Sequence, residues 1–303
     1  MTIRYIKPGI IKFCLLGLLT GCASAPDIDS DKYAGSGLND KSLDLLFATE
    51  FPAQSEADAL ARAAQAWQDG EVDKALFFYV RALQFNPENV ELLAHIGEIQ
   101  MQRNNLAMAK RAFLMARKYD PTHARSLEGL GLIFMSEGKD EHAIVELTMA
   151  IANDPSLWRA HNVLGVYADK DTDYVAAQTH YNAALSTNPD AAHVLNNRGY
   201  SKFLAGDVEG ATLDFYEAAN DRGFPQSWAN LGRVYAKQGW YDDAIITYGH
   251  VMSEANAYNN TGYAAIENGD FIQAKHYLHE AIRLSPTYFP AAEENLSLLE
   301  NLQ

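Results

Sequence analysis

Two sets of residues in this chain of 303 each recur at a strict interval of 34 residues. The alanines at that interval are Ala75, Ala109, Ala143 and Ala177. The prolines at the same interval are Pro87, Pro121, Pro155 and Pro189. A fixed period of this size marks an array of stacked supersecondary units, each burying its apolar face against the next. The period therefore predicts a repeat fold and disfavours most enzyme folds.

Each unit has the residues expected of two antiparallel helices. Small residues recur where the helices would approach most closely, because a larger side chain would overpack there. Each proline ends the second helix, which it cannot continue. Glycines mark the turn between the two helices, where a C-terminal cap often needs a positive φ. These turn glycines are Gly70, Gly138, Gly206, Gly239 and Gly269.

This pattern resembles the tetratricopeptide repeat, in which small residues stand at positions 8, 20 and 27 of a 34-residue unit, an aromatic residue near 24 and proline at 32. The second unit matches it at Gly97, Ala109, Phe113, Ala116 and Pro121. The resemblance implies an all-α solenoid over residues 56–303. It would be a right-handed superhelix of about seven helix pairs plus a C-terminal capping helix.

The capping helix is expected within residues 287–302. Its leucines would cover the last apolar face, because terminal repeats need a cap with a polar outer side. These leucines are Leu296, Leu298 and Leu299.

The period slips in the later units. From Gly199 to Gly232 is 33 residues, and from Gly232 to Gly262 is 30. In the sixth unit Val251 replaces the small residue at position 27, and no proline follows. The second helix of that unit, or its exit loop, must therefore be shorter.

The first 21 residues have the anatomy of a signal peptide, with basic residues before a short apolar run. The run from Phe13 to Leu19 is too short for a transmembrane helix, which needs roughly 20 apolar residues. The tetrapeptide ending at Cys22 resembles a bacterial lipobox. That resemblance implies cleavage before Cys22 and a diacylglycerol on its thiol. A soluble secreted protein with an incidental Cys22 is the alternative.

Residues 22–55 then comprise the lipidated cysteine and a flexible tether rich in Ala, Ser, Gly and Asp. By resemblance to lipoprotein sorting in enteric bacteria, Ala23 after the anchor favours the outer membrane. The expected location is thus the periplasmic face of the outer membrane, with the lipid as the membrane contact.

The charge and cysteine content restrict the partners and the chemistry. Asp and Glu total 39 against 24 Lys and Arg, for a net charge of −15. A surface this acidic repels phosphate backbones, so a nucleic-acid partner is disfavoured. The only cysteines are Cys14, in the leader, and Cys22, so the mature chain has no disulfide of its own.

Family resemblance places the binding face on the concave side, at positions 2, 5, 6, 9, 12 and 13 of each unit. Asparagine amides both donate and accept hydrogen bonds, and tyrosines add apolar area with a polar tip. The later units carry both types there, and we expect them to bind an extended peptide of a protein partner. The residues are Asn162, Asn196, Asn197, Tyr200, Asn230, Arg233, Lys237, Asn259, Asn260 and Tyr263. The early groove, with Trp67 and Met101 among its residues, is expected to be more apolar.

Catalytic and metal-binding alternatives find little support in the sequence. His276 and His279 lie three apart on one helix, but a metal site needs a third convergent ligand. The chain has no nucleophile elbow, no pair of cysteines at metal-binding spacing and no phosphate-binding glycine loop. We therefore expect a protein that is not an enzyme and that has no cofactor, metal or small-molecule substrate.

The lipobox, the tether and the seven units together resemble the TadD family of tight-adherence (Flp) pilus assembly proteins. The closest likeness lies in the C-terminal segments that begin at residues 192, 227 and 256. The resemblance implies a lipoprotein that aids the assembly, localisation or stability of the pilus secretin. The alternatives are a type IVa pilotin-like protein, an adaptor for cell-wall hydrolases or proteases, and a structural envelope or barrel-assembly factor.

Overall fold

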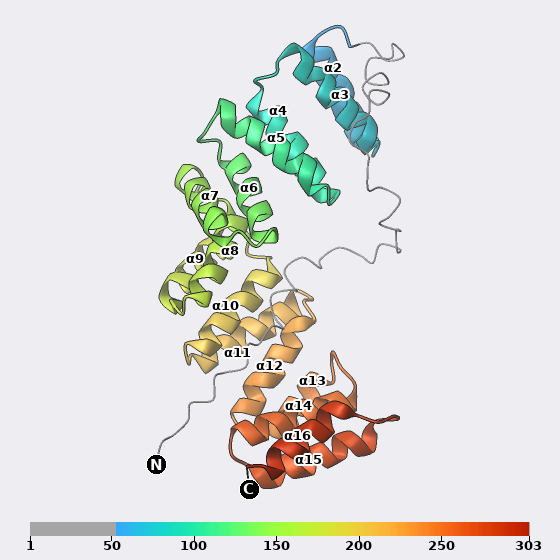
Figure 1. Ribbon diagram of the computed structural model, residues 1–303, viewed down its shortest axis with the longest axis vertical. Helices are drawn as coiled ribbons and strands as arrows, with labels where there is room; N and C mark the ends of the chain where they lie inside the picture. Colours follow the sequence, from blue (N-terminus) through green and yellow to red (C-terminus); the bar gives the residue numbers. More distant parts are fainter. Residues whose placement is uncertain (1–52, 303) are drawn as a thin grey trace.

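The computed structural model describes residues 53–302, and every regular element in that range is a helix (Figure 1). Seven antiparallel pairs stack along one axis and a single helix follows them, which confirms the predicted all-α solenoid. The pairs are α2 (Glu56–Gln68) with α3 (Val72–Phe85), α4 (Val90–Gln102) with α5 (Leu106–Tyr119), α6 (Ala124–Ser136) with α7 (Asp140–Asn153), α8 (Trp158–Lys170) with α9 (Tyr174–Thr187), α10 (Ala192–Leu204) with α11 (Val208–Tyr216), α12 (Gln226–Lys237) with α13 (Tyr241–Tyr248), and α14 (Glu254–Glu267) with α15 (Phe271–Leu284).

Small residues set the spacing of the stack. Each second helix packs against the first helix of its own pair and against the first helix of the next pair. The alanines predicted at positions 20 and 27 are fully buried in these contacts, as expected for helices that approach without a protruding side chain. They are Ala75, Ala82, Ala109, Ala116, Ala143, Ala150, Ala177, Ala184, Ala211, Ala218, Ala274 and Ala281.

One aromatic ring shows how two pairs share a contact. The fully buried ring of Phe113, on α5, lies between Gly97 on α4 and Gly129 on α6. A Cβ added at Gly97 would stand 2.5 Å from the ring, and one at Gly129 would stand 2.4 Å from it. The ring therefore fixes both the packing within the second pair and its packing on the third.

The turns inside the pairs match the prediction at five glycines, which have φ between 70° and 86°. In the second and fourth pairs the same left-handed position holds Asn104 (φ 58°) and Thr172 (φ 60°). Threonine is β-branched and strained in this conformation, so the geometry of the pair imposes the turn even where the residue opposes it.

The two departures from the period have structural counterparts. Helix α13 has 8 residues where α3 has 14, so the shortening predicted for the sixth unit lies in the second helix itself. In the fifth unit α11 has 9 residues and continues as one π-helical turn, η3 (Glu217–Asp221). The π turn was not predicted, because Ala211, Phe215 and Ala218 keep the spacing of a regular unit.

The stack ends with α16 (Pro290–Glu300), as predicted. Leu299 is buried in a cluster with Ala274 and Leu278 of α15, and Leu296 packs against that cluster. The expectation for Leu298 is wrong, because it is 41% exposed. It stands one residue before the buried Leu299, which rotates its side chain by about 100° around the helix, away from the buried face. None of the helices between residues 53 and 302 is long and apolar enough to cross a membrane.

We expect Gly129→Ala to lower the free energy of unfolding by about 1–3 kcal/mol, because the new methyl group overlaps the Phe113 ring. Urea denaturation measures the change, with Arg111→Ala, exposed on α5, as the control. Phe113→Leu should cost less in the Gly129→Ala background than in the parent, since the smaller side chain frees space. Additive costs would show that the ring does not couple the two pairs.

Candidate functional site

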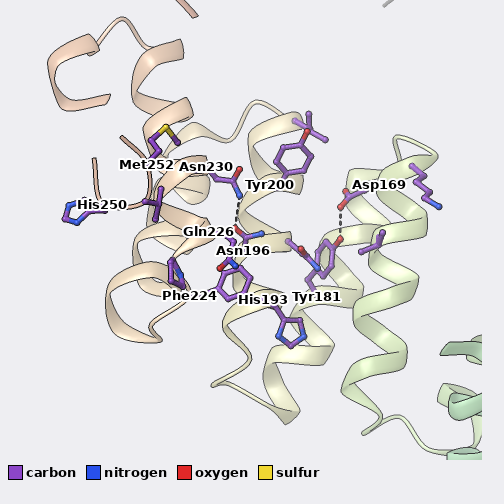
Figure 2. A pocket seen from close by; sticks show the side chains of 17 residues that line it. Asp169, Tyr181, His193, Asn196, Tyr200, Phe224, Gln226, Asn230, His250 and Met252 are labelled. Atoms are coloured by element: carbon purple, nitrogen blue, oxygen red, sulfur yellow. Dashed lines mark hydrogen bonds between the residues drawn. The ribbon is translucent and has the colours of Figure 1, made fainter. Parts of the chain in front are cut away.

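A pocket with a volume of about 810 Å³ lies along the first helices of the fourth to sixth pairs (Figure 2). Its floor and side walls come from three successive first helices, α8, α10 and α12, and from Tyr181 of α9. Its far wall comes from two loops that we call the exit loops, residues 222–225 and 249–253. The pocket therefore occupies the face that the resemblance assigned to binding.

The pocket lies where the period is broken. After a regular pair the chain turns at a proline two residues beyond the helix end, as Pro155 does after α7. The exit loops follow the π turn and the shortened α13 instead. They bring Phe224 and Met252 to the pocket wall, where a regular exit would carry the chain directly into the next pair.

The asparagines of the concave face bond to one another across the pairs. Asn197 Nδ2 on α10 donates to Asn162 Oδ1 on α8 at 3.0 Å. Asn196 Oδ1 accepts from Asn230 Nδ2 at 2.8 Å and from Ser227 Oγ at 2.9 Å, both on α12. These bonds tie three consecutive first helices together and hold the pocket floor.

Each of these side-chain amides has one half, either its NH2 group or its oxygen, without a hydrogen-bond partner among the described residues. Among residues 53–302, Asn196 Nδ2 has no hydrogen-bond acceptor, and Asn197 Oδ1 and Asn230 Oδ1 have no donor. A peptide backbone offers one donor and one acceptor per residue, so the free halves match what an extended segment presents.

An ion cluster between α10 and α11 fixes the position of α10. Asp214 of α11 is buried and accepts from Arg198 Nη2 at 2.7 Å and Nε at 2.8 Å. Lys202 Nζ stands 2.8 Å from the same carboxylate. Bidentate charged hydrogen bonds are among the strongest side-chain contacts, so they hold the helix that supplies most of the predicted pocket residues.

A carboxyl group lies in the pocket wall at the end of α8. Asp169 Oδ2 accepts a hydrogen bond from the Tyr181 hydroxyl at 2.7 Å (Figure 2). Burial raises the pKa of the Asp169 carboxyl, against the opposing effects of the Ser201 and Tyr181 hydroxyl groups. The same burial, with the Asp169 charge beside it, raises the pKa of the Tyr181 hydroxyl, so that group stays a donor at neutral pH.

The structure brings four of the ten predicted binding residues into the pocket: Asn196, Asn197, Tyr200 and Asn230. Asn162 is buried beneath it, bonded to Asn197. Cys22 lies outside the described residues. Partner contact by the ten residues stays a prediction.

The other five predicted residues lie on α12 and α14, away from the pocket lining. The guanidinium of Arg233 stands 5.9 Å from the centre of the Phe203 ring, and Lys237 is exposed. Asn259 is buried and accepts from Asn295 Nδ2 of the capping helix. Asn260 Nδ2 bonds to Met252 Sδ, and Tyr263 is exposed.

Sequence reasoning missed the residues that the irregular segments supply. Phe224, His250 and Met252 belong to the exit loops, and only the slip of the period signals them. Asp169 was available, since it stands at groove position 12 of the fourth unit. Its environment in the pocket depends on the hydrogen bond from Tyr181, which lies on a second helix and so falls outside the groove pattern.

Beside Met101, the first helices of the second to fourth pairs carry charged side chains. Arg159 pairs with the buried Glu128 at 3.1 Å, and Arg125 stands 3.8 Å from Glu98. With Met101, these side chains line a smaller pocket of about 410 Å³. The charges there are paired with one another.

The described residues contain no group of three or more His, Cys, Asp or Glu side chains that could hold a metal ion. His276 and His279 therefore gain no third ligand from the part of the chain that the structure describes. The pocket walls supply amide, hydroxyl and carboxyl groups suited to holding a peptide.

Comparisons with known proteins agree with the repeat pattern. Four family models, each described as a tetratricopeptide repeat, match residues 66–131, 162–227, 225–254 and 255–288. The anaphase-promoting complex subunit cut9 of Schizosaccharomyces pombe is 24% identical over 238 residues, which cover 75% of this chain and 36% of that protein.

The type IV pilus assembly protein PilF of Pseudomonas aeruginosa is 26% identical over 170 residues, covering 56% of this chain and 57% of that protein. A solved structure of Pseudomonas aeruginosa PilF superposes with a TM-score of 0.52 at 21% identity, over 69% of this chain and 96% of that one. The structural likeness is one of fold. The chain thus spans between one third and three fifths of these two curated relatives.

We expect Asp169→Asn to be more stable than the parent at pH 7.5, with the difference shrinking as the pH falls toward 4. Because the native pKa of Asp169 lies above its ordinary value, the native state holds this proton more strongly than the unfolded chain does. Ionisation of Asp169 therefore costs stability as the pH rises through this range. The amide oxygen of asparagine still accepts from Tyr181.

Urea denaturation between pH 4.5 and 7.5 measures this difference. Asp171→Asn, at an exposed position just beyond α8, is the matched control. A difference that grows toward acid pH would contradict the assignment of a destabilised charge to Asp169.

Proposed function

Because the chain is a tetratricopeptide repeat protein, we propose that it acts by binding an extended segment of a partner protein in the pocket of the fourth to sixth pairs. The observation that carries this proposal is the set of half-free amides on the pocket floor. Concave repeat surfaces are the usual binding faces of solenoids, and aromatic side chains such as Tyr200 and Phe224 commonly anchor partners. The proposed role is binding rather than catalysis.

The proposal places this binding at the outer membrane. The leader over residues 1–21 and the lipobox ending at Cys22 support a lipidated, periplasmic protein. A lipid anchor would confine the protein and an envelope partner to one surface, which raises their effective concentration without new contacts.

The proposed partner is the secretin of a tight-adherence pilus system. The TadD-like segments support this choice, as does the similarity to a protein named for type IV pilus assembly. Capture of a secretin segment in the pocket would keep that subunit beside the membrane during assembly. The function would then be to aid its assembly, localisation or stability.

We expect the pair Asn196→Ala and Asn197→Ala to reduce secretin recovered by affinity capture from envelopes by about tenfold, since each lost hydrogen bond contributes roughly 0.5–1.5 kcal/mol. The matched control is Asn153→Ala with Asn256→Ala, at exposed positions outside the pocket. Ala229→Leu tests the same site by filling the pocket without removing a hydrogen bond.

Thermal melting checks that each variant is folded before capture. Unchanged secretin recovery with Ala229→Leu and with the asparagine pair would show that the pocket is not the binding site. Absence of secretin from the parent's capture would reject the pilus partner, and recovery of peptidoglycan enzymes instead would favour the adaptor function.

We expect Cys22→Ser to abolish lipidation and to release the protein from the membrane fraction, because the serine hydroxyl does not replace the thiol as acyl acceptor. Fractionation and radiolabelled palmitate incorporation measure the two effects. Cys14→Ser, which changes the cysteine inside the leader, is the control and should leave both unchanged. Membrane association that survives Cys22→Ser would contradict the anchor.

A further inference from the structure

The charges around the pocket are unbalanced. Asp169 and Lys170 are the only Asp, Glu, Lys or Arg residues that line the pocket. Lys170 Nζ is paired with Asp140 Oδ2 at 3.1 Å and lies over the ring of Tyr167. Its charge is therefore already compensated by Asp140 at the start of α7, and Asp169 is left as the uncompensated charge of the pocket wall.

Asp169 has hydroxyl neighbours but no cation. Tyr181 donates to Oδ2, while the buried Oδ1 and the buried Ser201 hydroxyl lack a hydrogen bond of good geometry. No Lys, Arg or His side chain among residues 53–302 stands within 4.0 Å of this carboxylate. A partly buried carboxylate carries a free-energy cost of desolvation unless a cation or further hydrogen-bond donors compensate it. Binding of a cation beside Asp169 would therefore be favourable.

The surroundings suit a long basic side chain. Val166, on α8 with Asp169, and Leu204, on α10, line the pocket and offer apolar contact for a methylene stem. The free amide halves of Asn196 and Asn197 lie on the next helix, within the same pocket. An extended segment can therefore place its backbone on the amides and one side chain toward the carboxylate.

We propose that the pocket selects an extended peptide segment with a Lys or Arg side chain flanked by apolar residues, and that Asp169 recognises the basic group. This inference rests on the proposed function, since it names the chemistry of the segment bound at the same site. The net charge of −15 favours the approach of such a segment. Acidic or uncharged segments would leave the carboxylate unpaired.

Selection of a random nonapeptide phage library on the full chain, purified in detergent, tests the proposal. We expect the recovered peptides to be enriched in Lys or Arg between apolar residues. In titration calorimetry, replacing that basic residue by norleucine should weaken binding by about tenfold, the cost of one charge-assisted hydrogen bond. Replacement by Glu should weaken it further.

Matched variants identify the recognising group. Asp169→Asn should remove the preference for Lys over norleucine, whereas Asp171→Asn, outside the pocket, should retain it. Tyr181→Phe keeps the carboxylate charge and should retain the preference as well, with thermal melting as the check on folding. A Lys preference that survives in folded Asp169→Asn protein would overturn the assignment.

The failure of this inference is distinguishable from the failure of the proposed function. Pocket-specific peptides that are weakened by Ala229→Leu but show no basic preference would reject the role of Asp169 alone. Recovered peptides whose affinity Ala229→Leu leaves unchanged, or no recovered peptides at all, would reject the pocket as a peptide site and this inference with it.

Discussion

The fold depends on how closely the helix backbones approach one another. At the positions where one pair meets the next, alanine and glycine leave room for the facing backbone or for a single ring. Phe113 is the clearest case, because two glycines on different pairs leave the space that its ring fills. The spacing then repeats along the chain, so the first helices line one continuous concave face.

The pocket arises where this regularity fails. The π turn after α11 and the short α13 change how the chain leaves its fifth and sixth pairs, and the exit loops fill the far wall. Polar contacts compensate in the same region, since Asn162, Asn196 and Asn230 link three first helices through their side chains. The site is thus made of regular helices on its floor and irregular backbone on its far side.

The sequence was sufficient for the fold because packing positions are periodic. Ala143 or Pro155 can be recognised from the interval alone, without knowing what either contacts. It was also sufficient for the floor of the pocket, where Asn196, Asn197, Tyr200 and Asn230 follow from helix positions. It was insufficient for Leu298, whose neighbour Leu299 takes the buried place on the capping helix.

The far wall and Asp169 escaped prediction for a different physical reason. The conformation of a loop depends on the elements it joins. The slip of the period near Val251 therefore predicts that the exit loop is altered but does not predict its conformation. The importance of Asp169 comes from a hydroxyl on another helix and from a cation that is engaged elsewhere. Such relations are set by the three-dimensional arrangement and have no fixed spacing in the chain.

The exit loops also act on everything that follows them. In a linear array each pair touches only its neighbours, so the direction of α14, α15 and α16 depends on how α14 packs on α12 and α13 and on residues 249–253, which join α13 to α14. A change in the length of that segment would rotate the last pair and its capping helix together as one rigid body. Related chains can therefore re-aim their C-terminal surface by altering a few loop residues, while the buried alanines of every pair stay the same.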